Sequence, residues 1–150
     1  MTFAVIMISL ISHHVHSWTS NTSDEIWRSG WGQGWAEAQV THGSGNEIYV
    51  ACENGSGQPS SVSFQLAGKP PRIDSEVILV FDKEKPEGFS VGANGRIVAD
   101  CRACEANFSY VLGKLKSHSS IYVRFSDGRE STFTLKGAKK AIGDCKPGWP

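Results

Sequence analysis

An apolar N-terminal run followed by four cysteines constrains this 150-residue chain more than any other feature. The run covers residues 3–11, which is too short for a membrane-spanning helix of about 20 residues and fits the apolar region of a signal peptide. Residues 15–17 (VHS) end it with a small residue of the kind that signal peptidase prefers, although no Lys or Arg precedes the run. We therefore expect residues 1–17 to be a signal peptide and residues 18–150 to be a single exported β-rich domain, periplasmic or secreted.

An exported domain enters an oxidising compartment, where cysteines form disulfides instead of remaining free thiols. The chain has Cys52, Cys101, Cys104 and Cys145, and four cysteines allow three pairings. We favour Cys101–Cys104 with Cys52–Cys145, and a bridge that closes a long loop stabilises most in the chain-entropy model, by about 4 kcal/mol. Alternatively, the close pair splits, and each of its cysteines bonds to one of the distant two.

The close spacing of Cys101 and Cys104 is also found in two kinds of functional site. A structural zinc site normally has two close pairs of ligands, and this chain has one, so we expect no metal. A thiol–disulfide oxidoreductase has a strand, a C-x-x-C motif and a helix in succession, because a helix N-terminus stabilises a thiolate. Residues 96–100 have the pattern of a strand and a helical pattern follows Cys104, so this redox activity is an alternative to purely structural disulfides.

The charge and composition of the chain indicate a β-rich domain that does not bind nucleic acid. Basic and acidic residues balance at 15 each, which argues against the basic surface of a nucleic-acid-binding protein. No second apolar stretch follows the leader, so we expect no membrane insertion after its removal. Sixteen glycines and many Ser, Thr and Asn residues predict short strands joined by turns. The predicted fold is mainly β: a small antiparallel β-sandwich with one or two short helices, stapled by disulfides.

Alternating apolar residues predict strands at 47–52, 61–66, 120–125 and 131–135, the last two forming a hairpin around Asp127-Gly128. Two helices are also predicted. The apolar spacing after Cys104 becomes helical over residues 105–116, and a short helix follows over residues 137–142.

Two further segments have patterns that predict strands. The continuous apolar run at residues 76–81 predicts a central strand covered on both faces. Asn94-Gly95 is a hairpin signal, so we expect residues 89–91 to pair with residues 96–99.

Three tryptophans, Trp27, Trp31 and Trp35, follow one another at intervals of four residues with glycines between them. Residues four apart share a face in an extended chain, so we expect the three rings to lie on one side. They form either an aromatic binding platform or part of the core, and the glycines are alternatively the tip of a hairpin. A second candidate binding segment is the charged loop at residues 82–88.

The chain has no motif that identifies a catalytic site. After the leader, the only histidines are His42 and His118, both in segments that we predict to be loops. A Ser-His-Asp set is a spatial arrangement that sequence does not reveal. We find no G-x-S-x-G elbow, P-loop, H-E-x-x-H motif or dinucleotide fingerprint. We therefore assign no catalytic residue and no cofactor.

The C-terminal half contains several segments in a familiar order: CRACEA at 101–106, LGKL at 112–115, IYVRF at 121–125 and FTLKGAKKA at 133–141. Over residues 76–145 the chain resembles exported bacterial proteins of the invasion-associated locus B type, and it also looks like the periplasmic VasI proteins of type VI secretion systems. The resemblance implies a secreted β-sandwich without known catalytic machinery, and it transfers no site residues.

These observations together predict a non-catalytic protein-binding module of the bacterial envelope whose partner is another protein. An inhibitor or immunity protein against an envelope-acting toxin fits the size, the compartment and the lack of catalytic motifs. The alternatives are a thiol–disulfide oxidoreductase that uses the C-x-x-C motif at 101–104, and a structural accessory component of a secretion system.

Overall fold

The computed structural model describes residues 17–18 and 24–148. The predicted signal peptide lies outside the described residues, except that Ser17 belongs to the first strand, β1 (Ser17–Trp18). Neither helix in the described part of the chain is long and apolar enough to cross a membrane.

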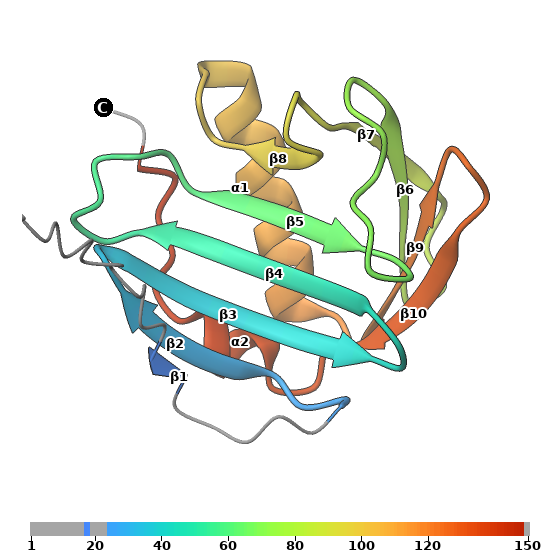
Figure 1. Ribbon diagram of the computed structural model, residues 1–150, viewed down its shortest axis with the longest axis horizontal. Coiled ribbons are helices and arrows are strands. Elements are labelled where there is room, and N and C mark those ends of the chain that lie inside the picture. Colours follow the sequence, from blue (N-terminus) through green and yellow to red (C-terminus); the bar gives the residue numbers. More distant parts are fainter. Residues whose placement is uncertain (1–16, 19–23, 149–150) are drawn as a thin grey trace, which may run out of the picture.

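The fold is mainly β, with two antiparallel sheets, two helices and two disulfides, as the sequence predicts (Figure 1). The larger sheet has six strands in the spatial order β1, β2, β3, β4, β5 and β8. Beyond β1, their bounds are β2 (Arg28–Gly32), β3 (Trp35–His42), β4 (Asn46–Glu53), β5 (Ser61–Gln65) and β8 (Arg96–Val98).

The smaller sheet has four strands in the order β10, β9, β6 and β7. Their bounds are β6 (Glu76–Phe81), β7 (Glu87–Ser90), β9 (Ser120–Phe125) and β10 (Glu130–Thr134). The β9–β10 hairpin around Asp127-Gly128 confirms the prediction, and this sheet stands at the right of Figure 1.

The helices α1 (Arg102–Ser117) and α2 (Ala138–Ile142) cover one face of the six-stranded sheet and lie behind it in Figure 1. Both match predicted helices. The apolar residues of α1 are buried in the core, and they are Phe108, Val111, Leu112 and Leu115. Burying side chains of this size contributes about 1.5–3 kcal/mol each, so packing against the sheet, more than helix propensity, fixes α1.

Two strand predictions are wrong in part. β7 pairs with β6, and β8 pairs with β5, so the segments around Asn94-Gly95 lie in different sheets and do not form a hairpin. The turn closes locally, with Gly95 N donating to Gly92 O at 2.9 Å, but it carries the chain from one sheet to the other. β6 is central, but only its inward residues are buried, while Ile78 and Val80 are half-exposed.

Both disulfides have the favoured pairing, Cys52–Cys145 and Cys101–Cys104. The first ties the C-terminal tail to β4, and Ser60 N donates to Pro147 O at 2.9 Å beside it. The second closes the start of α1. The fold therefore has one long-range covalent link and one local one.

Candidate functional site

A tight turn at Gln33-Gly34 joins β2 to β3 and reverses the chain between the second and third tryptophans. Both turn residues have positive φ, 52° and 79°, as a two-residue type I′ hairpin turn requires. Trp31 pairs with Ala36, and Trp35 pairs with Gly32. Since cross-strand partners share a face, Trp31 lies on the face that packs on the core and Trp35 lies on the opposite face. The expectation that all three rings share one face is therefore wrong for Trp35.

The three tryptophans have different surroundings. Trp27 is 7% exposed, and its Nε1 donates to Thr134 O at 2.8 Å, so it belongs to the core and joins β2 to the smaller sheet. Trp31 is 58% exposed near the tip of the hairpin, and Trp35 is half-buried. Trp31 is thus the most accessible of the three predicted binding residues.

The tip of the β2–β3 hairpin is held by the loop that follows β4. Gly34 O accepts hydrogen bonds from Asn54 N at 2.9 Å and Ser56 N at 3.1 Å. A side chain at Gly34 would place its Cβ 2.4 Å from Ser56 N, so this close approach requires glycine. The hairpin tip is therefore fixed before any partner binds.

A shallow hollow of about 210 Å³ lies beside Trp35 on the face opposite the helices. Gly32 and Ala51 leave room there, and Trp35, Tyr49 and Arg96 surround the space. The Tyr49 hydroxyl donates to the Glu37 carboxylate, and burial followed by this bond raises the pKa of Tyr49 above its usual range. A row of polar side chains crosses five strands in register on the same face: Arg28, Gln39, Tyr49, Ser63 and Arg96.

The Cys101–Cys104 disulfide lies at the N-terminus of α1, where Cys101 is the N-cap residue. Cys104 N donates to Cys101 Sγ at 3.1 Å, and both cysteines are half-buried. Cys104 also lines a hollow of about 510 Å³, together with Arg96, Asp100 and Asn107. The predicted succession of strand, C-x-x-C motif and helix is confirmed as geometry.

The sulfur atoms of this pair and the Asp100 carboxylate lie within 4.8 Å of one another, the only such grouping of metal-ligand side chains among residues 24–148. In this structure the sulfurs bond to each other. A disulfide sulfur is not a thiolate ligand, so this oxidised arrangement does not fit a zinc ion.

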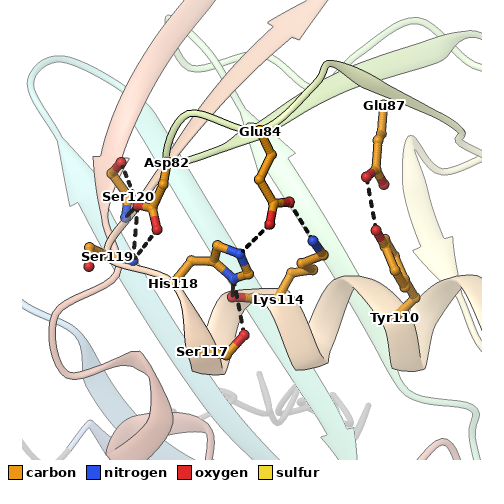
Figure 2. Close-up of polar contacts among 9 residues, drawn as sticks. All are labelled: Asp82, Glu84, Glu87, Tyr110, Lys114, Ser117, His118, Ser119 and Ser120. Carbon is orange, nitrogen blue, oxygen red and sulfur yellow. Dashed lines mark hydrogen bonds and ion pairs between the residues drawn. The ribbon is translucent and has the colours of Figure 1, made fainter.

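The charged loop after β6 is anchored to the end of α1 (Figure 2). Glu84 accepts hydrogen bonds from Lys114 Nζ and from His118 Nε2, the latter at 2.9 Å. Asp82 accepts from Ser119 N at 3.1 Å and from Ser120 N at 2.8 Å. The loop is therefore a defined clamp between the smaller sheet and α1, and His118 caps the helix.

The same cluster places a serine, a histidine and a carboxylate in contact. Ser117 Oγ lies 3.0 Å from His118 Nδ1, and His118 Nε2 faces Glu84 (Figure 2). Nδ1 also lies 3.1 Å from Lys114 O. When Nε2 donates to the Glu84 carboxylate, Nδ1 of the neutral ring carries no hydrogen and accepts one from the Ser117 hydroxyl. We interpret this cluster as a structural clamp, because Lys114 holds the same carboxylate, His118 ends the helix and Ser117 is exposed.

Sequence reasoning found the tryptophan segment and the cysteine pair, but it missed the contacts of Gly34 and of Glu84. Those contacts join segments that are far apart in the chain, and no local sequence pattern predicts them.

Comparisons with curated proteins and with solved structures each found no match. A comparison with family models matched the YfjT family over residues 25–142, from the loop before β2 to the end of α2. The match covers most of the chain and nearly all of the described fold, so this protein belongs to the YfjT family.

Proposed function

We propose that this YfjT-family protein is a protein-binding module, periplasmic or secreted, which binds its partner non-catalytically with the tip of the β2–β3 hairpin. The observation that carries the proposal is Trp31, a large ring that is 58% exposed on a tip fixed by backbone hydrogen bonds. Tryptophans dominate the binding energy of many protein interfaces. A fixed tip also loses little conformational entropy on binding.

The binding surface consists of Trp31, Gln33 and Trp35, which come from the turn and from both of its strands. The two rings lie on opposite faces, so a partner that grips the tip contacts Trp31 from one side and the hollow beside Trp35 from the other. A protein partner with a cleft that receives a hairpin fits this shape better than a flat surface does.

Two observations support a place in the bacterial envelope. Both disulfides are of the kind that persists in oxidising compartments, and the leader-like run precedes the domain. An inhibitor or immunity protein against an envelope-acting toxin needs a rigid surface and no catalytic group. The resemblance of residues 76–145 to exported envelope proteins supports the same compartment.

The test is a pull-down from the envelope fraction of the native host with the purified mature protein and two variants. Trp31→Ala removes the exposed ring of the hairpin, and Ile73→Ala removes a side chain that is 65% exposed elsewhere. We expect a protein that the wild type and Ile73→Ala retain and that Trp31→Ala loses. With that protein purified, Trp31→Ala should raise the Kd at least tenfold, because a hot-spot residue contributes about 2 kcal/mol or more.

Circular dichroism and thermal unfolding show whether Trp31→Ala is folded, and an exposed position predicts a change within about 0.5 kcal/mol. Equal binding by all three proteins would contradict the hairpin surface. A captured protein that belongs to a secretion apparatus would support instead an accessory component of that apparatus.

A further inference from the structure

The two disulfides of this protein have different surroundings. Cys52 is 2% exposed, and its bond to Cys145 spans 93 residues of sequence and fixes the C-terminal tail. Cys101 and Cys104 are three residues apart and half-buried, and Cys104 lines a hollow of about 510 Å³. Cys145 is half-buried like Cys101 and Cys104, so the two bonds differ in the burial of Cys52, in the length of the closed loop and in the hollow beside Cys104.

The N-terminus of α1 stabilises negative charge on Cys101. The helix has 16 residues, and its peptide dipoles place partial positive charge at the N-cap. Cys104 N already donates to Cys101 Sγ at 3.1 Å, a bond that strengthens when the sulfur becomes a thiolate. Of the two sulfurs, that of Cys101 is therefore the better leaving group.

Cys104 is the cysteine of the pair that borders the hollow. Arg96, which also borders the hollow beside Trp35 and interacts electrostatically with Tyr49, lines this hollow too. Two carboxylates, Asp74 and Asp100, border the same space, so the hollow carries groups of both signs. It suits a polar peptide segment that brings a cysteine to Cys104.

We propose that Cys101–Cys104 is a thiol–disulfide exchange site whose substrate is a pair of cysteines in another exported protein. The activity is separate from the hairpin surface, because it uses a different part of the fold. It requires a substrate dithiol as the reductant, and a second disulfide couple reoxidises the pair by the reverse reaction.

The exchange has two steps. A substrate thiolate attacks Cys104 Sγ, a substrate–Cys104 disulfide forms, the Cys101–Cys104 bond breaks, and Cys101 leaves as a thiolate at the helix N-terminus. The second substrate thiolate then attacks the substrate sulfur of that mixed disulfide. Cys104 leaves and takes up a proton from solvent. Two electrons pass from the substrate dithiol, which becomes a disulfide, to the cysteine pair, which becomes a dithiol.

In the first experiment, the wild-type protein is equilibrated in a series of buffers in which the ratio of reduced to oxidised glutathione increases. Free thiols are then alkylated, and peptide mass spectrometry identifies which cysteines are reduced. We expect Cys101–Cys104 to open at ratios that leave Cys52–Cys145 closed. At early times after mixing, glutathione should be found on Cys104. Two bonds that open together, or glutathione found chiefly on Cys101, would overturn the proposed step.

The second experiment distinguishes exchange activity from an easily reduced structural bond. The probe is a synthetic peptide with two cysteines, and the oxidised protein is mixed with it under anaerobic conditions. We expect the wild type to oxidise the peptide at least tenfold faster than oxidised glutathione at the same disulfide concentration. A rate no greater than that of glutathione would refute an exchange activity.

The control variant is the double substitution Cys101→Ser and Cys104→Ser. Serine is a good N-cap residue, so α1 should start normally and the variant should fold. We expect its rate to fall to that of the uncatalysed reaction although Cys52–Cys145 is intact. Undiminished peptide oxidation by this variant would place the activity elsewhere and contradict the proposal.

Discussion

His118 and Glu84 join two segments that lie 34 residues apart, with His118 Nε2 at 2.9 Å from Glu84 Oε1 (Figure 2). Lys114 binds the same carboxylate from the last turn of α1. The contact holds the loop between β6 and β7 against the end of the helix. It therefore couples the position of α1 to the smaller sheet.

Replacing this carboxylate should destabilise the fold in a pH-dependent way. The hydrogen bond from Lys114, and then that from His118, hold the pKa of Glu84 below its ordinary value of 4.5. A lowered pKa in the folded state means that the stabilisation is complete above pH 4.5 and is lost as the pH falls through the folded pKa. We expect Glu84→Gln to lower Tm slightly at neutral pH, because the pair is partly exposed.

The measurement is thermal unfolding of the wild type and Glu84→Gln between pH 7 and pH 3, where the two Tm values should converge below pH 4.5. A higher salt concentration should reduce the Tm difference between the wild type and Glu84→Gln at neutral pH. A difference that stays constant down to the lowest pH would contradict the role of the ionised carboxylate.

Arg129 links the β9–β10 turn to the segment after β5. Its guanidinium donates to Leu66 O at 2.7 Å, Lys69 O at 3.0 Å and Pro70 O at 3.1 Å, and it pairs with Asp127. We expect Arg129→Ala to lower the free energy of unfolding by about 2 kcal/mol, since charged hydrogen bonds to three carbonyls are lost.

Urea denaturation measures this loss, with Lys83→Ala as the control because Lys83 is exposed in the turn after β6. The control should change stability by less than about 0.5 kcal/mol. Arg129→Lys should recover only part of the loss, because an ammonium group does not reproduce the planar fork. Equal stability of Arg129→Ala and the control would refute the link.

The elements that could be predicted from the sequence are those whose burial pattern is local. The position of α1 follows from the helical spacing of its apolar residues, Phe108, Val111, Leu112 and Leu115. The β9–β10 hairpin follows from the alternation of apolar residues on both sides of the turn at Asp127-Gly128. In these segments the period, the turn residues and the tertiary packing all favour the same structure.

The predictions that are wrong concern strand pairing and the faces on which side chains lie, and both depend on a turn. Asn94-Gly95 forms a turn, but the strands on either side of it, β7 and β8, pair with β6 and β5 in different sheets. The sequence does not show which strand each of them pairs with. The four-residue spacing of the tryptophans applies to a continuous strand, and the turn at Gln33-Gly34 interrupts it. The alternative prediction, that the glycines form the tip of a hairpin, is confirmed at Gly34. The candidate cysteine site was identified because its motif is contiguous.

The tip of the hairpin should depend on glycine at position 34 for two separable reasons. Gly34 has φ 79°, which strains any other residue, and an added Cβ would meet Ser56 N at 2.4 Å. Gly55 has φ 98° but open space around it, so Gly55→Ala reports strain alone. We expect Gly55→Ala to cost about 1 kcal/mol and Gly34→Ala clearly more.

Urea denaturation measures the loss of stability in Gly34→Ala and in Gly55→Ala. Amide exchange of Asn54 and Ser56 reports whether the tip of the β2–β3 hairpin has detached from the loop after β4. Faster exchange of both amides is expected in Gly34→Ala only, since both donate to Gly34 O. If the two variants are equally destabilised, backbone strain accounts for the glycine and the close approach contributes nothing.

Removing each disulfide should have unequal effects on stability, because the closed loops differ in length. Cys52–Cys145 closes a separation of 93 residues and Cys101–Cys104 one of 3. The chain-entropy model gives about 4–5 kcal/mol for the long loop and about 2 kcal/mol for the short one. We expect Cys52→Ala with Cys145→Ala to lower the urea midpoint far more than Cys101→Ser with Cys104→Ser.

The long-loop variant should also loosen the C-terminal tail near Ser60, a buried residue that donates through N to Pro147 O and through its hydroxyl to Lys146 O. Faster amide exchange of Ser60 in that variant, and not in the serine variant, would show this effect. A larger loss of stability in the serine variant would mean that Cys101–Cys104 is the structural bond. The accessibility and the helix-terminal position of that pair would then serve the fold and not an exchange reaction.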